Sequence, residues 1–214
     1  MQALKGIQAI VLSAGLSTRF PGNKLLFPLG GIPIVARTIR SLVVQEKIEK
    51  VIVVTGFMRE DVEAAIKRHT EPSLLDSKVI FVYNPMYREG GMSSSIKKGL
   101  EMVPRDSDIL VMPGDVACIS AETIKTVLDY HVSSTSQITV ACYKGRHGHP
   151  IIFKSTLRNE LEAINEATYG LKKVVKNHIN EVNCVETSDP GVVLDIDTTS
   201  DIEICEDLLI KKGI

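Results

Sequence analysis

Buried strands that alternate with amphipathic helices predict a three-layer α/β fold for this chain of 214 residues. Three apolar runs, at 7–12, 50–55 and 78–83, have the continuous hydrophobic character of strands covered on both faces of a parallel sheet. Helical patterns separate these runs, and such alternation favours parallel strands joined by right-handed crossovers. We therefore expect a mostly parallel, twisted sheet with helices on both faces, built as a single domain over 1–214.

Local signals place the individual elements along the chain. Pro33 suits the first turn of a helix, where its missing N–H is not needed, and Ser120 is a favoured N-cap. We expect strands at 7–12, 50–55, 78–83, 108–112, 137–143, 182–187 and 192–197. We expect helices at 33–45, 58–69, 93 to 99 or 103, 120–131, 157–164, 170–178 and from about 198. The segments predicted as loops or turns are 71–77, 84–92 and 144–149.

Composition and charge exclude several classes of protein. Lys and Arg total 25 against 26 Asp and Glu, so no global field favours nucleic acid, and the chain has no Trp for base stacking. No apolar run approaches a membrane span, and the N-terminus is too short for a signal peptide. Cys118, Cys142, Cys184 and Cys205 show neither zinc spacing nor a disulfide framework, which favours a reducing compartment. We expect a cytoplasmic protein that binds neither nucleic acid nor membrane.

A loop of small residues follows the first strand and ends in two cations. Its candidate nucleotide-binding residues are Leu12, Ser13, Ala14, Gly15, Ser17, Arg19 and Lys24. Small side chains let backbone N–H groups approach an anion, and the two cations can neutralise a polyphosphate. The alternative is an ordinary strand–helix turn with two surface cations. Neither GxxxxGK[ST] nor GxGxxG is present, which counts against a P-loop and against a Rossmann-type oxidoreductase.

Carboxylates follow two later strands of the predicted sheet. Asp115 comes after the fourth strand, and Asp195 and Asp197 close the last one. Ligands of open α/β sheets bind beyond the carboxyl ends of the strands, and Mg²⁺ prefers oxygen ligands there. Asp115 is therefore a candidate Mg²⁺ ligand, with a helix cap or turn residue as the alternative. His147 and His149 stand two residues apart, but no third nearby ligand supports a metal site.

The motifs resemble those of the MobA-like nucleotidyltransferases, in the order in which that family carries them. The matches are 12–24 to LxAGxSxR(M/F)GxxK, 91–100 to GMxxSIxxGL, 114–117 to GDxP, 148–153 to GHPxxF and 195–201 to DIDTPxD. GHPxxF is an element of the molybdenum cofactor cytidylyltransferase branch. The resemblance covers residue 7 to about 208 and implies a Rossmann-like nucleotidyltransferase fold, with a nucleotide-binding part over about 1–116 and an acceptor-binding part over about 117–200.

The same resemblance implies the role of each site residue. Arg19, Lys24 and Asp115 would be catalytic; Gly91, Ser95 and Gly114 would join the nucleotide site; Asp115 and Asp197 would hold Mg²⁺; His149 and Lys172 would contact the acceptor. The chain departs from the family pattern at Ala117, Thr168, Lys172 and Thr199, where relatives carry Pro, an acidic residue, Arg and Pro.

CTP and a molybdopterin-type acceptor are the implied substrates. Ala14 stands where guanylyl-transferring relatives carry Gly, and its methyl group would crowd a purine, which favours CTP. Alternatives are a nucleotidyltransferase for a sugar or alditol phosphate, a GTP-dependent guanylyltransferase, and a non-catalytic nucleotide-binding protein. A molybdenum enzyme or its maturation factors would be the protein partners.

Overall fold

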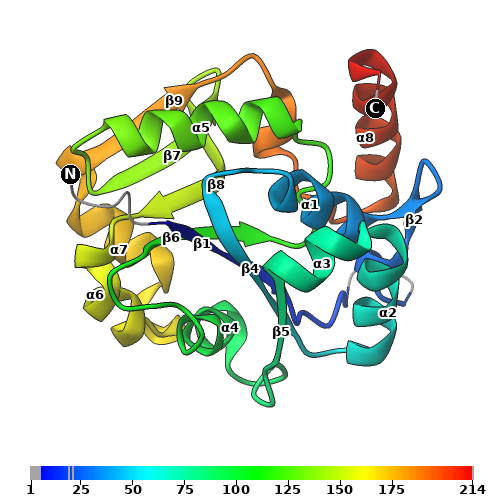
Figure 1. Cartoon of the computed structure of the whole chain (residues 1–214), viewed down its shortest axis with the longest axis horizontal. Helices are drawn as coiled ribbons and strands as arrows, with labels where there is room; N and C mark the ends of the chain where they lie inside the picture. The colour runs from blue at the N-terminus through cyan, green and yellow to red at the C-terminus, as the bar shows by residue number, and fades with distance from the viewer. Residues whose placement is uncertain (1–5, 19, 21, 214) are drawn as a thin grey trace.

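A seven-stranded sheet forms the centre of the computed structural model, which describes residues 6–18, 20 and 22–213 (Figure 1). Its strands are β1 (Ile7–Ser13), β4 (Ile48–Thr55), β5 (Val79–Tyr83), β6 (Asp108–Pro113), β7 (Ile138–Tyr143), β8 (Arg146–Phe153) and β9 (Val182–Glu186). They lie in the order β5-β4-β1-β6-β8-β7-β9. Strand β8 runs antiparallel to both neighbours and the other pairs are parallel, so the predicted mostly parallel sheet is confirmed.

Helices cover both faces of the sheet (Figure 1). One face carries α1 (Ile34–Val43), α2 (Arg59–His69), α3 (Pro72–Lys78), α5 (Ala121–Ser133) and α8 (Thr199–Lys212). The other face carries α4 (Gly91–Leu100), α6 (Arg158–Ala163) and α7 (Leu171–Asn177). Because side chains alternate along a strand, Ala9 and Val11 of β1 pack into the first core and Ile10 packs into the second. The three-layer architecture is confirmed.

Short elements complete the described part of the chain. Strands β2 (Pro28–Leu29) and β3 (Ile32–Pro33) form a separate antiparallel hairpin. The 3-10 turns are η1 (Lys24–Leu26), η2 (Ser155–Leu157), η3 (Glu166–Thr168), η4 (Ile179–Glu181) and η5 (Pro190–Val193).

The segment 71–77 was predicted to be a loop and instead forms most of α3. Pro72 occupies its first turn, and the Glu71 carboxylate accepts a hydrogen bond from the Ser73 backbone N–H at 3.3 Å. Pro is favoured at this position and the accepting side chain satisfies a free N–H, so both residues start the helix. Leu74 and Leu75 then pack against the core. The polar composition of the segment concealed these signals.

The segment 144–149 was predicted to be a turn, but strand β8 already begins at Arg146. The turn consists of Lys144 and Gly145, which have φ angles of 50° and 74°. Two consecutive positive φ angles are typical of a two-residue hairpin, whose twist matches the flanking strands. His147 and His149 therefore lie on a strand beside β7.

The segment 192–197 was predicted to be a strand, and this prediction is wrong. Turn η5 occupies its first residues, and the chain then runs without regular structure to α8. The Asp189 side chain starts the turn by accepting from the Gly191 N–H at 2.8 Å. Gly191 lies so close to the loop after β6 that a Cβ there would be 2.5 Å from the Cys118 carbonyl oxygen. Strand alternation therefore does not place Asp195 and Asp197.

The four cysteines form two disulfides, so the expectation of unpaired cysteines is wrong. Cys118 of the loop after β6 pairs with Cys205 of α8, and Cys142 of β7 pairs with Cys184 of β9. The partners are 87 and 42 residues apart in sequence and meet only in the folded chain. The cysteines thus give no support to the predicted reducing compartment.

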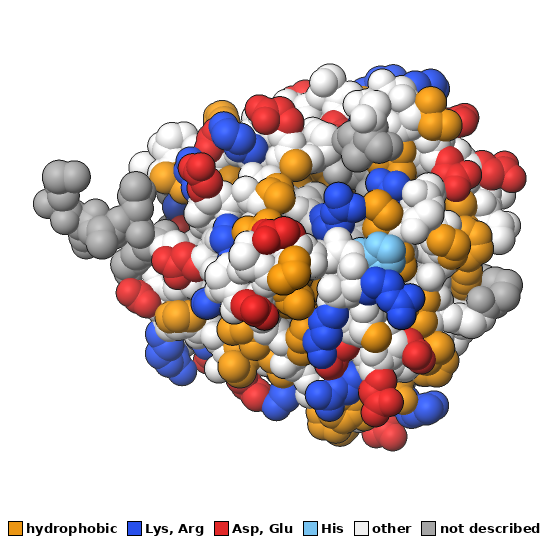
Figure 2. Space-filling model, turned by 45° about the vertical axis from the view of Figure 1, so that its right-hand side comes forward, with side chains coloured by type: hydrophobic (Ala, Val, Ile, Leu, Met, Phe, Trp, Pro, Cys, Tyr) orange, Lys and Arg blue, Asp and Glu red, His pale blue; other side chains and the backbone are white. Residues whose placement is uncertain are grey.

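Acidic and basic side chains are interspersed over the face of the molecule drawn in Figure 2. This distribution agrees with the nearly equal totals of 25 basic and 26 acidic residues. Within the described ranges, no helix has the length and apolar character needed to cross a bilayer.

Candidate active site

A pocket of about 320 Å³ lies at the carboxyl ends of β1 and β6, where ligands of open α/β sheets bind. The predicted site residues that line it are Leu12, Ala14, Gly15, Ser17, Lys24, Gly91, Ser95, Asp115 and Asp197. The other lining residues are Thr18, Phe20, Leu25, Tyr87, Met92 and Pro113. Of the remaining predicted nucleotide-binding residues, Ser13 and Gly114 are buried and do not line the pocket, and Arg19 lies outside the described residues.

The loop after β1 leaves backbone exposed to the pocket. A Cβ built at Gly15 would meet nothing within 4 Å, so the space beside its backbone is open. Ser17 adopts a left-handed φ of 52°, which turns the chain. The Asn23 side chain then fixes the end of the loop, because it donates to the Phe57 carbonyl at 3.2 Å and accepts from an N–H of η1. Turn η1 begins with Lys24 and so positions its side chain.

Lys24 contacts both predicted metal-binding carboxylates. Its Nζ lies 2.5 Å from Asp115 Oδ2 and 2.8 Å from Asp197 Oδ1. The Lys24 and Asp115 side chains are largely buried, with 16% and 13% of their surfaces exposed, whereas Asp197 is 35% exposed. The structure therefore brings together three residues that span 173 positions of sequence.

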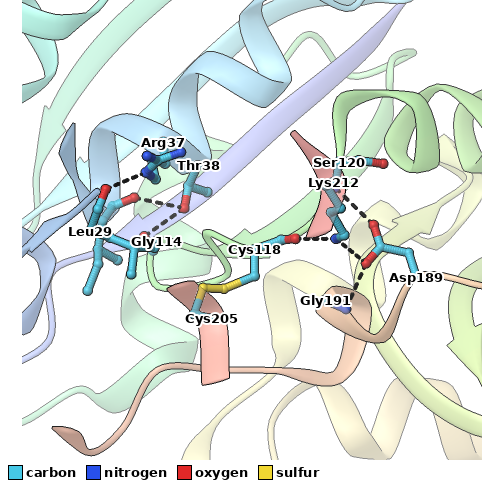
Figure 3. Close-up of a disulfide and its surroundings, with 11 residues drawn as sticks. Leu29, Arg37, Thr38, Gly114, Cys118, Ser120, Asp189, Gly191, Cys205 and Lys212 are labelled. Carbon is cyan, nitrogen blue, oxygen red and sulfur yellow. Dashed lines mark hydrogen bonds and ion pairs between the residues drawn. A yellow bond between two sulfur atoms is a disulfide. The ribbon is translucent and has the colours of Figure 1, made fainter. Parts of the chain in front are cut away.

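Gly114 is required by the packing that places Asp115. A Cβ at Gly114 would lie 2.6 Å from Ser13 Oγ and 3.1 Å from the Leu12 carbonyl oxygen, at the end of the neighbouring strand. The Gly114 carbonyl also accepts a hydrogen bond from Thr38 Oγ1 of α1 at 3.0 Å (Figure 3). The sequence suggested that Gly114 contacts nucleotide, and the packing gives it a clear structural role.

Helix α8 positions Asp197 through its N-terminal cap. The Asp201 carboxylate accepts from the N–H groups of Asp197 and Thr198 at 3.0 and 2.7 Å, and it forms a capping box with Thr198. The neighbouring Ile196 N–H donates to the Asp115 carbonyl at 3.4 Å. The two carboxylate-bearing segments are thus joined directly at the site.

A second set of contacts joins the same two segments away from the pocket (Figure 3). The Cys118–Cys205 disulfide connects the loop after Asp115 to α8. Near the end of α8, Lys212 Nζ donates to the Cys118 carbonyl and forms an ion pair with the buried Asp189 carboxylate, both at 2.5 Å. These links restrict movement of α8 relative to Asp115.

Burial and neighbouring charges shift the titration of the site. Burial alone would lower the pKa of Lys24, but Asp115 and Asp197 raise that pKa above its usual value and keep the lysine charged. Burial raises the pKa of Asp195, and the two other carboxylates add to the rise while His149 opposes it. Burial lowers the pKa of His149 in spite of the nearby carboxylates.

The carboxylates of Asp115 and Asp197 have the chemistry of a divalent cation site. Both touch the same ammonium group, so their oxygens converge on one region beside the pocket. Asp115 Oδ1 is buried and has no hydrogen-bond partner among the described residues, which leaves an acceptor available for a cation. Oxygen donors suit Mg²⁺ and Mn²⁺. These two residues therefore fit a metal of that class.

The loop that follows β5, from residue 84, leads directly into α4, which borders the pocket. The helix begins at Gly91, which has a φ of 57°. Its first turns therefore contain Ser93, Ser94 and Ser95, and none of these serines is the N-cap. Asn84 donates from one amide nitrogen to the hydroxyls of Ser94 and Ser95 at 2.9 and 3.0 Å. The Ser93 N–H donates to Glu166 at 2.7 Å. These bonds hold the start of α4 against its neighbours.

The two predicted acceptor residues have different surroundings. His149 of β8 faces the carboxylates, with its Nε2 3.9 Å from Asp195 Oδ1. It precedes Pro150, and the peptide bond between them is cis. Lys172 lies exposed in the first turn of α7, and within the described ranges it makes no contact with the Lys24–Asp115–Asp197 cluster. The structure brings His149 to the site and does not join Lys172 to it.

Sequence reasoning missed several residues that shape the pocket. Tyr87 lines it from the loop before α4, Met92 lines it from the first turn of α4, and Asn23 fixes the loop after β1. An aromatic residue within a Gly-rich loop at a strand end was an available signal for Tyr87. Asn23 gave no such signal, because its partner Phe57 follows a different strand.

Residues 9–182 match the family model of the MobA-like NTP transferase domain. The chain belongs to this family. The matched range contains Lys24, Asp115 and the whole loop after β1, and it ends before Asp197.

Family relatives and solved structures share the fold. The chain is 29% identical over 134 residues to the bifunctional protein GlmU of Geobacillus sp., covering 62% of this chain and 27% of the relative. It thus spans about a quarter of the length of that relative. Rv0371c of Mycobacterium tuberculosis H37Rv superimposes with a TM-score of 0.78 at 25% identity, covering 97% of this chain and 100% of that one.

Two further solved structures hold ligands. A complex of Rv0371c with manganese has a TM-score of 0.74 at 23% identity and covers 96% of this chain and 100% of that chain. A synthetase of CMP:2-keto-3-deoxy-manno-octonic acid, solved with CTP, has a TM-score of 0.71 at 14% identity, covering 97% and 99% of the two chains. At these identities the likeness shows the fold.

Proposed function

We propose that this chain is a nucleotidyltransferase that moves CMP from CTP to the phosphate of a molybdopterin and releases pyrophosphate. The observation that carries the proposal is the convergence of Lys24, Asp115 and Asp197 beside a pocket bordered by the open backbone of Gly15. A cation, two carboxylates and exposed backbone are what a bound triphosphate with its metal requires. A binding protein without catalysis would have no need for both carboxylates.

The reaction needs little covalent chemistry from the protein. An acceptor phosphate oxygen attacks the α-phosphorus in line and forms the new O–P bond. The bond from the α-phosphorus to the bridging oxygen breaks, and its electron pair leaves with pyrophosphate. A phosphate acceptor is already ionised near neutral pH, so no strong general base is required. Catalysis is then positioning and neutralisation of charge.

Lys24, Asp115 and Asp197 divide that work. The Lys24 ammonium, which its neighbours keep charged, pairs with phosphate oxygens of the bound nucleotide. Asp115 and Asp197 hold Mg²⁺, which when bound supplies further neutralisation of the triphosphate. The manganese complex of a structural neighbour is consistent with a cation of this class. Arg19 is assigned to the triphosphate by the family motif.

The preference for CTP is assigned to Ala14. This residue lines the pocket and is buried, with 4% of its surface exposed, so its methyl group is fixed in place. A purine would meet this methyl where a pyrimidine would not. Replacement of Ala14 by Gly should raise the relative rate with GTP by about tenfold, the usual effect of one methyl group in a pocket. An unchanged CTP-to-GTP ratio would contradict the assignment.

Gly15→Ala is a sharper test of the phosphate loop. The added methyl has open space in the free protein, so the melting temperature should not change. A nucleotide that lies against this backbone would collide with the methyl, and its KM should rise at least tenfold. Gly145→Ala is the control for KM, because that glycine also has open space but lies in the hairpin turn away from the pocket; its φ of 74° makes a loss of stability expected there, but no change in KM. An unchanged KM in Gly15→Ala would place the nucleotide elsewhere.

Two observations support a molybdopterin as the acceptor: the GHPxxF-like element, and the position of His149 near Asp195. His149 lies beside the carboxylate cluster, where an acceptor phosphate must reach the α-phosphorus. A sugar or alditol phosphate is the alternative acceptor, because it offers the same ionised oxygen. The proposal also divides the chain into a nucleotide-binding part up to residue 116 and an acceptor-binding part from residue 117. It includes a cytoplasmic location, and a molybdenum enzyme or its maturation factors as protein partners.

One experiment separates these alternatives. The purified chain is incubated with Mg²⁺ and each of the four NTPs, with no acceptor, with molybdopterin, or with a panel of sugar and alditol phosphates. Pyrophosphate release that needs CTP and molybdopterin supports the proposal in full. Release with a sugar phosphate alone would retain the transferase and replace its acceptor. No release with any combination, from protein that binds nucleotide, would favour the non-catalytic alternative.

A further inference from the structure

Three neighbouring strands at the β9 edge of the sheet bring together two cysteines and a histidine. Cys142 lies on β7, His147 on β8 and Cys184 on β9, and their ligand atoms all lie within 4.8 Å of one another. This cluster is separate from the pocket that holds Lys24 and Asp115.

Sheet register explains why these side chains meet. His147 is directly opposite Cys142 on one side, and Glu186 is directly opposite Cys142 on the other. Directly paired residues project from the same face of a sheet, and Cys184 lies two positions before Glu186 on the same strand. All four side chains therefore share one face. The Glu186 carboxylate accepts from the Gly145 N–H at 3.3 Å and so is held at the β7–β8 turn.

We propose that, when the Cys142–Cys184 disulfide is reduced, Cys142, His147 and Cys184 bind one zinc-like, thiophilic divalent cation. Two thiolates and an imidazole are a donor set that Zn²⁺ prefers, and water supplies the fourth ligand. The donors differ from the oxygens of Asp115 and Asp197, which suit Mg²⁺. The two sites would therefore select different metals.

The exposure of two of the three ligands would let a cation enter the site from solvent. Cys184 and His147 are exposed and Cys142 is buried, so the cluster is open on one side only. Reduction of the disulfide by a phosphine or a dithiol takes two electrons and two protons and yields two thiols. Metal binding then releases the thiol protons to solvent. Disulfide and metal site are thus alternative states of the same pair.

The other disulfide provides an internal control. Cys118 and Cys205 are both fully buried, and no histidine or carboxylate completes a ligand group with them among the described residues. If any reduced cysteine pair of this chain could bind the cation, this pair would bind it as well. If the histidine and the open face matter, only the Cys142 pair should respond.

Cobalt titration of the full-length chain tests the proposal. The Asp115→Asn/Asp197→Asn variant is used as background to remove the oxygen site, and it is reduced with a phosphine and titrated with Co²⁺. We expect one equivalent per chain, with thiolate-to-cobalt charge-transfer absorption in the near ultraviolet and visible bands of tetrahedral Co²⁺. Zn²⁺ should displace the signal. Cys184→Ser should abolish it, and His147→Gln should weaken Co²⁺ binding at least tenfold.

Three results would overturn the proposal. The first is the absence of charge-transfer absorption in the reduced background variant. The second is its loss in a folded Cys118→Ser/Cys205→Ser variant, which would assign the metal to the buried pair. The third is a His147→Gln variant that binds Co²⁺ as tightly as the background variant does, because the imidazole would then not be a ligand. His147→Gln leaves both cysteines in place, so it tests the site even if a cysteine variant does not fold.

Discussion

Strand β6 carries an aspartate at its start, Asp108, and another just beyond its end, Asp115, and each is paired with a lysine. At the start of β6, both carboxylate oxygens of Asp108 have partners. Asp108 Oδ1 accepts from the Ser155 N–H at 2.8 Å, and Oδ2 contacts His131 Nε2 at 3.1 Å and Lys154 Nζ at 3.2 Å. Burial alone would raise the pKa of Asp108, but these partners hold it below its usual value. This carboxylate joins three elements of the fold.

Asp115 is less completely partnered. Its Oδ2 contacts Lys24, while its Oδ1 is buried with no partner in the described part of the chain, and the residue lines the pocket. Buried carboxylate oxygens normally accept hydrogen bonds, so this oxygen is an acceptor that the described residues leave available beside the pocket. A lysine partner therefore does not distinguish a structural carboxylate from a functional one. The unused acceptor does.

The largest expected effect is on turnover at the Asp115 end. Asp115→Asn should lower the rate of nucleotidyl transfer at least about 100-fold, because the triphosphate loses its neutralising ion. The melting temperature should change by only a few degrees. Asp106→Asn, which removes an exposed carboxylate near the other end, is the control and should keep full activity.

Asp197→Asn should cost about as much as Asp115→Asn, and the double variant should lose little more than either single variant. Fully additive losses would show that the two carboxylates do not act on one metal. Normal turnover in either single variant would show that the carboxylate it lacks is not needed for catalysis.

The next largest effect is on stability at the Asp108 end. Asp108→Asn should lower the free energy of unfolding by about 3 kcal/mol, since it leaves buried partners without their charge. Activity per folded molecule should remain near that of the unchanged protein. Urea unfolding and turnover of the same sample measure both quantities. A stable but inactive Asp108→Asn variant would reverse the roles assigned to the two ends.

The pH dependence of stability should also originate at this end. Burial lowers the pKa of His131 below 6.5, despite its bond to Asp108. The unfolded chain therefore takes up a proton on this histidine before the folded chain does, and stability falls as pH drops below about 6.5. The lowered pKa of Asp108 adds a further loss below about pH 3.8. His149, whose pKa burial also lowers, contributes to the first slope.

His131→Gln separates these contributions. The variant should reduce the loss of unfolding free energy between pH 7.5 and 5.5 and leave the contribution of His149 intact. Urea titrations of both proteins at the two pH values measure the difference. An identical slope in the variant would show that His131 does not set this dependence.

The smallest effect concerns the metal-free protein. Lys24→Met should lower the melting temperature by about 2–4 °C, the shift for about 1 kcal/mol, because Asp115 and Asp197 then lose the ammonium group that contacts both of them. Mg²⁺ should restore more stability to this variant than it adds to the unchanged protein. Lys125→Met, which removes an exposed lysine paired with Asp129, is the control and should respond to Mg²⁺ like the unchanged protein. A Lys24→Met variant that Mg²⁺ does not stabilise would contradict a shared metal site.

Local sequence patterns were enough to predict the sheet and most of its helices. Runs such as 7–12 and 50–55 are continuously apolar because both of their faces are covered, and that property is local. These patterns also placed Asp115 just after a buried strand and Asp197 just before the C-terminal helix, because a strand end and a helix start are both local signals.

The contacts of those residues could not be predicted from local patterns. The ion pairs of Lys24 join segments up to 173 residues apart, and both disulfides join residues that no spacing rule connects. The segment that bears Asp197 was predicted as a strand, yet turn η5 and the cap of α8 set its course. Local propensity decides which secondary structure a segment forms, but contacts between distant segments depend on how the helical layers pack on the sheet. The unused oxygen of Asp115 arises from that packing, and so no sequence pattern could reveal it.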